Sequence, residues 1–166
     1  MNHAETVPPR TPAGAVLGLV AFGLAVVAVA VVGGLAAASA GMDYLALARP
    51  SWAPPASVFG PVWSVLYAMI ALAGWLVWRR WGWAGARAAL TAYAVQLGLN
   101  ALWTPLFFGA GAIGAAFAEI CVLWVAIVVT VVLFARRHRL AAVLLVPYLG
   151  WVTFAAALNL TIWQLN

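Results

Sequence analysis

The chain has 166 residues, of which 67% are hydrophobic and 7% are charged, with a formal net charge of +5 and a mean hydropathy of +1.08. A soluble domain of this length could not build a wetted surface from so few polar residues, so the composition excludes a water-soluble globular protein. The apolar stretches are long and continuous, which also excludes a membrane β-barrel with its short alternating segments. The sequence therefore predicts an all-α integral membrane protein.

Five apolar stretches are long enough to cross a bilayer, whose hydrocarbon core of about 30 Å needs roughly 20 helical residues. They are separated by arginines, by a proline-rich stretch and by the glycine break at Gly109–Gly111. The predicted spans are residues 13–40, 61–78, 88–108, 112–135 and 140–165. They form one domain, residues 13–166, behind a short polar tail of residues 1–12. The first span is too long for the apolar core of a signal peptide, so we expect it to be retained.

Basic residues predict the orientation, because cytoplasmic loops close to span ends carry an excess of them. With five spans, the N-terminus and the second and fourth loops lie on one side of the membrane. That side holds all but one of the eight basic residues, namely Arg10, Arg79, Arg80, Arg87, Arg136, Arg137 and Arg139. Arg49 lies on the other side, so we expect a cytoplasmic N-terminus and an external C-terminus. Arginines divided among short loops form no continuous basic surface, and we expect no nucleic-acid partner.

The stretch of residues 50–67 contains four prolines and two tryptophans at the entrance to the second span. Proline fixes its own φ angle and pushes the preceding residue towards extended geometry. Residues 52–61 should therefore form an ordered, non-helical segment that leads into a helix starting near Pro61. We expect the loop of residues 41–60 to cover a cavity.

The ten tryptophans fall into two groups. Those near span ends fit an anchoring role at the membrane interface: Trp75, Trp78, Trp81, Trp83 and Trp163. Trp63, Trp103 and Trp151 instead have polar or helix-breaking neighbours within a span. Their distances from the loops predict one aromatic pocket that opens outward beneath the first loop.

Three amide side chains lie at a similar depth: Gln96, Asn100 and Asn159. Because amides are costly in lipid, they should point into the bundle. For Gln96 and Asn159, hydrogen bonding between helices is slightly favoured over ligand contact. Asn100 together with the three pocket tryptophans favours a ligand site, because apolar pockets combine large aromatics with a few polar groups.

Glu119 is the acidic residue of the predicted spans. Two roles fit it equally well, a functional intramembrane acid and an interfacial group that favours the helix dipole. The single cysteine, Cys121, excludes an intrachain disulfide, and we expect no metal site. The spacing Gly14-x-x-x-Gly18 would permit close contact with another helix or with a second copy of the chain.

Four blocks of sequence resemble the TspO/MBR family, the tryptophan-rich sensory proteins related to the mitochondrial translocator protein. The blocks follow the family's order through the second to fifth spans, whereas the first span resembles the family only as an apolar helix. They are Arg49-Pro-Ser-Trp-Ala-Pro-Pro with Phe59-Gly-Pro-Val-Trp-Ser-Val-Leu-Tyr67, residues 96–109, Glu119 followed by Leu123-Trp124, and residues 147–155 with Leu158-Asn159.

The resemblance implies a five-helix bundle, usually dimeric, that binds porphyrins, haem and hydrophobic drugs. It implies protoporphyrin IX or haem as a ligand rather than as a tightly bound cofactor, with membrane lipid and a second copy of the chain as partners. The bacterial cell membrane is then favoured over the outer membrane. The candidate ligand-binding residues are Trp52, Phe59, Trp63, Tyr67, Gln96, Asn100, Trp103, Phe107, Phe108, Tyr148, Trp151, Ala155 and Asn159.

Three functions remain open. The favoured one is a membrane sensor or regulator that binds a tetrapyrrole between aromatic side chains. The alternatives are a transporter of porphyrin, sterol or another lipid, and an enzyme of light- and oxygen-dependent porphyrin degradation with Trp63 and Trp151 as candidate catalytic residues. No acid–base or nucleophile–base pair predicts conventional catalysis. Sterol recognition is disfavoured, because Leu160 and Gln164 stand where the mitochondrial relatives' cholesterol-recognition pattern has tyrosine and a basic residue.

Overall fold

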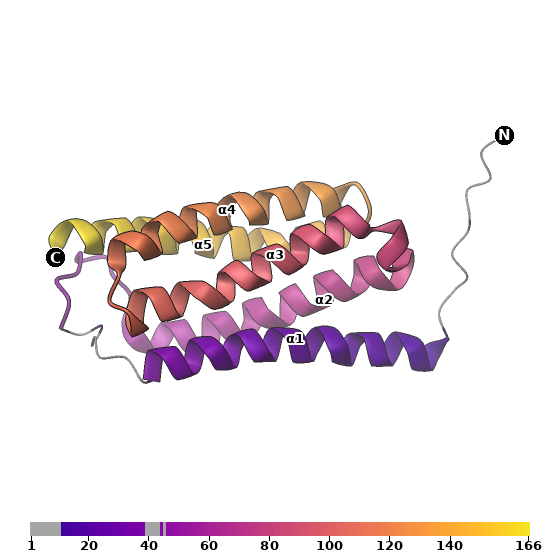
Figure 1. Cartoon of the computed structure of the whole chain (residues 1–166), viewed down its shortest axis with the longest axis horizontal. Helices are drawn as coiled ribbons and strands as arrows, with labels where there is room; N and C mark the ends of the chain where they lie inside the picture. The colour runs from indigo at the N-terminus through magenta and orange to yellow at the C-terminus, as the bar shows by residue number, and fades with distance from the viewer. Residues whose placement is uncertain (1–10, 39–43, 45) are drawn as a thin grey trace.

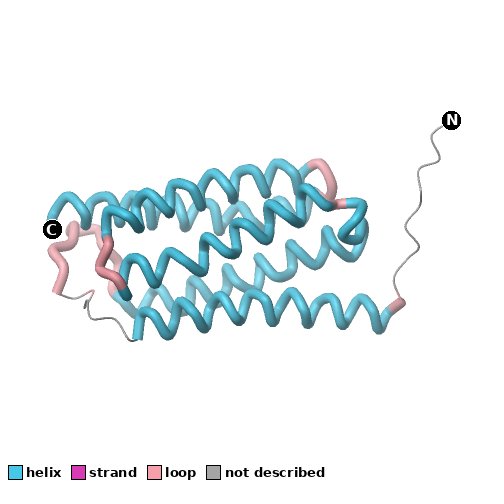
Figure 2. Tube along the Cα trace, in the orientation of Figure 1, coloured by secondary structure: helices cyan, strands magenta, loops and turns pink. Residues whose placement is uncertain are grey.

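The computed structural model describes residues 11–38, 44 and 46–166, and these residues form helices and loops without a strand (Figures 1 and 2). The prediction of an all-α fold is confirmed. The helices are α1 (Pro12–Ala38), η1 (Ala56–Val58), α2 (Phe59–Gly85), α3 (Arg87–Thr104), η2 (Pro105–Gly109), α4 (Ile113–Ala135) and α5 (Arg139–Leu165). Most of the predicted tail and part of the loop of residues 41–60 lie outside the described residues.

Within the described residues, four helical segments are long and apolar enough to cross a membrane: Pro12–Ala38, Ala56–Gly85, Ile113–Ala135 and Arg139–Leu165. The predicted third span became α3, an 18-residue helix, followed by the π-helical turn η2. Its polar residues, among them Arg87, Gln96 and Asn100, lower its apolar character. The crossing of the membrane by α3 therefore stays a prediction.

The second helix is longer than the predicted span of residues 61–78. It begins at Phe59, ahead of Pro61, and continues beyond Arg79 and Arg80 to Gly85, with an interruption at Gly82, whose φ is 63°. Glycine adopts this left-handed conformation at little cost. The helix can thus change direction there and lead into α3 after a single intervening residue.

The five long helices pack side by side along one axis (Figure 1). Contacts join α1 to α2 and α3, join α5 to α2 and α4, and join α3 to α4. The helices therefore follow one another around the bundle in the order α1, α2, α5, α4, α3. We call the end where α1, α3 and α5 finish the loop end, and the opposite end the arginine end.

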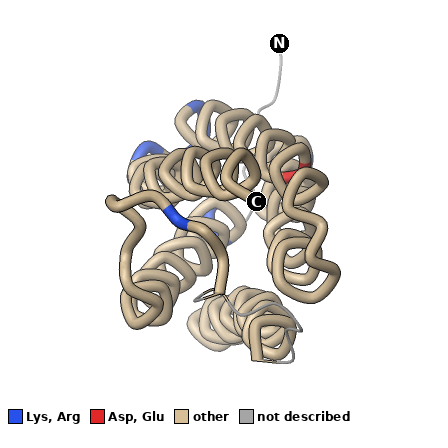
Figure 3. The backbone as a smooth tube through the Cα atoms, turned by 90° about the vertical axis from the view of Figure 1, so that its left-hand side faces the viewer, with Lys and Arg blue, Asp and Glu red and all other residues tan. Residues whose placement is uncertain are grey.

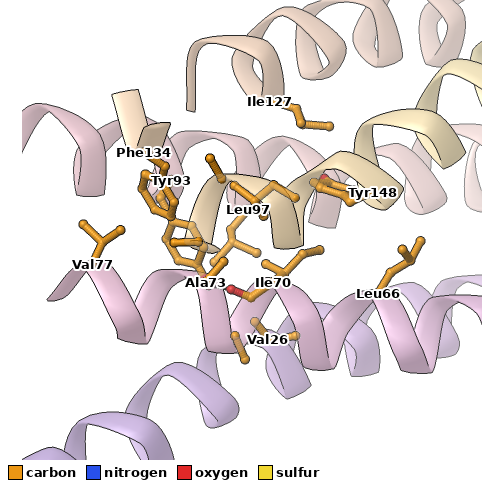
Figure 4. Packing of buried hydrophobic residues seen from close by; sticks show 14 of the residues in the cluster. Val26, Leu66, Ile70, Ala73, Val77, Tyr93, Leu97, Ile127, Phe134 and Tyr148 are labelled. Carbon is orange, nitrogen blue, oxygen red and sulfur yellow. Dashed lines mark hydrogen bonds between the residues drawn. The ribbon is translucent and has the colours of Figure 1, made fainter. Parts of the chain in front are cut away.

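Aromatic and aliphatic side chains from α2, α3, α4 and α5 fill the centre of the bundle (Figure 4). Tyr93 stacks on Phe134, with ring centroids 5.9 Å apart, and its hydroxyl donates a hydrogen bond of 3.2 Å to the carbonyl of Ile70. In lipid, such packing and hydrogen bonding hold helices together, because apolar burial alone gives little advantage over contact with acyl chains.

The tryptophans at the arginine end connect helices, which goes beyond the anchoring role expected of them. Trp75 donates a 2.8 Å hydrogen bond from Nε1 to the carbonyl of Ala15 on α1, and Trp81 donates one of 3.1 Å to the carbonyl of Arg137. The ring of Trp78 lies against Gly18, where an added Cβ would come within 2.0 Å of it. Gly18 thus permits close contact with another helix of the same chain, as its spacing predicted, and contact with a second copy stays a prediction.

Gly74 offers a test of this packing. It lies where α1 and α3 meet α2, and a Cβ there would be 2.6 Å from Tyr93 Cζ and 2.7 Å from Phe22 Cε1. Gly74→Ala should lower the stability of the bundle by about 1–3 kcal/mol, because two rings must move. Thermal denaturation in detergent measures the effect. Gly98→Ala on α3 is the control, since its Cβ meets no atom within 4 Å; equal melting temperatures for the two variants would contradict the prediction.

Candidate functional site

A cavity of about 770 Å³ lies at the loop end of the bundle. This volume is within the range of about 300–1,000 Å³ of ligand sites. α1, α2, α5, the end of α3, the η2 turn and the first loop all contribute to its wall. The lining residues are Ala30, Gly33, Gly34, Ala37, Tyr44, Ala56, Phe59, Gly60, Trp63, Ser64, Tyr67, Trp103, Thr104, Phe107, Phe108, Ala155, Leu158, Asn159 and Ile162.

Local sequence creates the space. α1 turns a run of small residues towards the cavity, Ala30, Gly33, Gly34 and Ala37. On the other side, α3 ends at Pro105, and the chain continues as one wider π turn, closed by a 2.9 Å hydrogen bond from the amide of Ala110 to the carbonyl of Pro105. π turns of this kind often occur at functional sites. This turn brings Phe107 and Phe108 to the cavity wall.

Seven aromatic side chains contribute to the remaining wall. Trp63 stacks on Tyr67 with ring centroids 5.1 Å apart and an interplanar angle of 30°. Trp103 stacks on Phe107 at the same centroid distance and an angle of 26°. Stacked rings offer flat, polarisable faces, and such faces suit a planar apolar ligand.

Two polar networks support these rings. Asn100 accepts a 3.0 Å hydrogen bond from the hydroxyl of Tyr67 and donates one of 3.0 Å to the hydroxyl of Tyr148. Asn159 accepts a 3.2 Å bond from Trp103 Nε1 and donates one of 2.9 Å to the carbonyl of Ile113. Each amide therefore joins three segments of the bundle and fixes the ring that it holds.

Eight of the candidate residues line the cavity: Phe59, Trp63, Tyr67, Trp103, Phe107, Phe108, Ala155 and Asn159. Asn159 lines the cavity and also forms the hydrogen bonds between helices that were favoured for it. Ligand contact itself is still a prediction for all eight.

The other five candidates do not line the cavity. Asn100 and Tyr148 are buried behind Tyr67. Trp151 packs against Phe59 with ring centroids 5.9 Å apart, and Trp52 packs against Phe154 at 5.8 Å. Gln96 is 1% exposed, and its amide atoms have no hydrogen-bond partner among the described residues. The hydrogen bond between helices that was favoured for Gln96 is thus not formed there.

Several lining residues were missed by the sequence reasoning. The glycines and alanines of α1 gave a signal, since two adjacent glycines in a membrane helix leave room beside it, but the first span was treated only as an apolar helix. Tyr44 lies outside any regular element, and no sequence pattern placed it against Phe59 and Phe108, whose ring centroids are 5.7 Å and 6.5 Å from its own.

Glu119 lies inside the bundle, with 8% of its surface exposed. Both carboxyl oxygens are buried and have no hydrogen-bond partner among the described residues. Glu119 therefore packs against the other helices, and both of its predicted roles stay predictions. Glu119 does not line the cavity, so the structure gives it no part in the site.

The first loop is fastened to the end of α5. The side chain of Asn166 accepts a 3.1 Å hydrogen bond from the amide of Ala48 and donates one of 3.1 Å to the carbonyl of the same residue. Within the loop, the hydroxyl of Tyr44 donates to the carbonyl of Pro54 at 3.4 Å. The described part of the loop thus has fixed contacts beside the cavity, to which it contributes Tyr44 and Ala56.

Comparison with known proteins identifies similar sequences over most of the chain. The TspO/MBR family profile matches residues 21–164. The tryptophan-rich protein TspO of Archaeoglobus fulgidus is 40% identical over 152 residues, which cover 91% of this chain and 98% of that protein. The human translocator protein is 40% identical over 125 residues, 74% of each chain. The tryptophan-rich sensory protein of Cereibacter sphaeroides is 40% identical over 120 residues, 72% of this chain and 74% of that protein.

Fold and cavity together define an α-helical integral membrane protein with an aromatic-lined chamber at one end of its bundle. The extent of the profile match and the identity to these relatives also show the family within this class of membrane proteins. The chain belongs to the TspO/MBR family.

The Asn100 network should contribute measurably to stability. Asn100→Ala leaves the hydroxyls of Tyr67 and Tyr148 without their shared partner, and we expect a loss of about 1–3 kcal/mol. Tyr67→Phe should cost less, because Asn100 keeps its bond to Tyr148. Thermal denaturation in detergent ranks the variants, and a stability of Asn100→Ala equal to that of the unaltered protein would refute the assignment.

The contact of Asn166 with the loop is open to a separate test. Asn166→Ala should raise the hydrogen-exchange rate at the amide of Ala48 by about three- to tenfold, as expected for the loss of a bond worth about 1 kcal/mol. Mass spectrometry of the peptides around Ala48 measures it. Gln164→Ala, at an exposed position of the same helix, is the control. Unchanged exchange in Asn166→Ala would show that the contact does not hold the loop.

Proposed function

We propose that this protein is a membrane sensor or regulator that binds a tetrapyrrole, protoporphyrin IX or haem, in the cavity at the loop end. The observation that carries the proposal is the cavity of about 770 Å³, whose wall includes seven aromatic side chains from segments distant in the sequence, four of them in two stacked pairs. A flat macrocycle would gain dispersion and stacking energy against these rings. Tyr67, Ser64 and Asn159 supply polar groups for its edges.

The ring, rather than a central metal, is the expected point of recognition. The histidine of the described chain is His138, which caps the start of α5 by accepting a hydrogen bond from the amide of Ala141. That residue lies at the arginine end, a bundle length away from the cavity. We therefore expect haem and metal-free porphyrin to bind with similar affinity.

The names of relatives support both sensing and transport. The relative from Cereibacter sphaeroides is called a tryptophan-rich sensory protein, and the human relative a translocator protein. Transport is thus the second candidate function of this chain. It would require a second conformation in which the cavity communicates with the other end of the bundle.

An enzymatic role in photo-oxidative porphyrin breakdown was predicted to involve both Trp63 and Trp151. Trp63 lines the cavity, whereas Trp151 packs against Phe59 outside the lining. Of these two tryptophans, only Trp63 is therefore expected to contact a ligand directly. This arrangement gives less support to the enzyme than to the binding protein.

In the membrane, we propose that all five long helices cross the bilayer, with the arginine end in the cytoplasm and the cavity outside. Six arginines at one end support this orientation, Arg79, Arg80, Arg87, Arg136, Arg137 and Arg139. A bacterial cell membrane and a homodimeric assembly are part of the proposal.

Porphyrin titration tests the proposal. Protoporphyrin IX should quench tryptophan fluorescence saturably in the detergent-solubilised protein, in the dark. Trp63→Leu should weaken binding by about five- to twelvefold, because one stacking face worth roughly 1–1.5 kcal/mol is lost. Trp83→Leu, at an exposed position of the arginine end, is the matched control. Absence of saturable quenching in the unaltered protein would overturn the proposed function and turn attention to sterols and other lipids.

A further inference from the structure

Arg49, at the loop end of the bundle, forms no ion pair with an acidic residue of the described part of the chain. Among the described residues, Arg49 is the basic residue of this end, and Figure 3, which faces it, shows one basic segment in the loop that crosses the front. The described chain contains one acidic residue, Glu119, which is buried within α4. Arg49 forms no ion pair with it.

The guanidinium of Arg49 does not itself line the cavity but lies against Tyr44, which does. Its carbon Cζ is 4.6 Å from the centroid of the Tyr44 ring. Tyr44 lines the cavity, and its ring touches those of Phe59 and Phe108, which line it as well. One aromatic ring thus connects the cation to the chamber.

Arg49 is only partly solvated. The residue is half-buried, and its Nε is buried without a hydrogen-bond partner among the described residues. A buried donor without a partner costs free energy, so an anion that satisfied it would bind favourably. The planar guanidinium matches a carboxylate in particular, because two of its N–H groups can bond the two oxygens at once.

We propose that Arg49 binds the carboxylate of the ligand, so that the cavity selects apolar molecules carrying an acid group over neutral ones of the same shape. The apolar part of the ligand would lie between the aromatic rings, and the acid at the loop beside Tyr44. The inference rests on the proposed function and adds to it a determinant of specificity. It also gives a role to the one arginine that the charge pattern of the arginine end does not explain.

The test compares protoporphyrin IX, which carries two carboxylates, with its dimethyl ester, which has the same ring and no acid. Dissociation constants are measured by fluorescence quenching for the unaltered protein, Arg49→Gln, Arg49→Lys and the control Arg136→Gln at the arginine end. The unaltered protein should bind the acid about tenfold more tightly than the ester, as expected for a charged hydrogen bond. Arg49→Gln should weaken binding of the acid alone, so that the preference disappears. Arg49→Lys should retain part of it, and Arg136→Gln all of it.

Each other outcome overturns the inference. Equal affinity of the unaltered protein for acid and ester would remove the carboxylate contact but leave the tetrapyrrole site intact. Equal weakening of both ligands by Arg49→Gln would show that the arginine only supports Tyr44, and a lowered melting temperature of that variant would accompany it. If neither compound bound the unaltered protein saturably, the proposed function would fail and this inference with it.

Discussion

The amide of Asn100 sets a constraint on which the cavity end of the bundle depends. A buried amide without partners is costly in a bundle surrounded by lipid, so α2 and α5 must keep the register that brings the hydroxyls of Tyr67 and Tyr148 to it. Tyr67, held in this way, stacks on Trp63 and forms part of the wall. These hydrogen bonds thus hold the aromatic wall in place from the side that faces away from the cavity. The side of the wall that faces the cavity stays mainly apolar.

The two ends of the bundle are held together by different contacts. At the arginine end, short connections bring the helices together, and tryptophans and arginines pack against one another. The guanidinium groups of Arg80 and Arg137, for example, both lie over the ring of Trp81. At the loop end, Pro50, Pro54 and Pro55 lie outside the helices, in the described part of the first loop, and each fixes its own φ angle. The described part of this loop lies beside the cavity and is held there by turns and by hydrogen bonds to Asn166.

Much of this arrangement was predictable from the sequence. Continuous apolar stretches bounded by arginines, by prolines and by the Gly109–Gly111 break located the helices. Polar neighbours separated Trp63 and Trp103 from the tryptophans of the arginine end. The failures have a common physical cause. Residue spacing gives the depth of a side chain but not the direction in which it points, so Trp151 and Gln96 were assigned to a cavity that they do not line. Tyr44 and Asn166 act through contacts of a loop with distant residues, and local pattern carries no information about such contacts.

The small residues that α1 presents to the chamber have a consequence for how proteins of this kind diversify. An added Cβ at Gly34 would meet no neighbouring atom within 4 Å, and one at Gly33 would only touch Thr104. Side chains at these positions can grow into the empty volume without disturbing the rings and amides opposite. The match to the family profile begins within α1, at residue 21. The size of the chamber can therefore be changed from α1 while the rings and amides of the other helices stay in place.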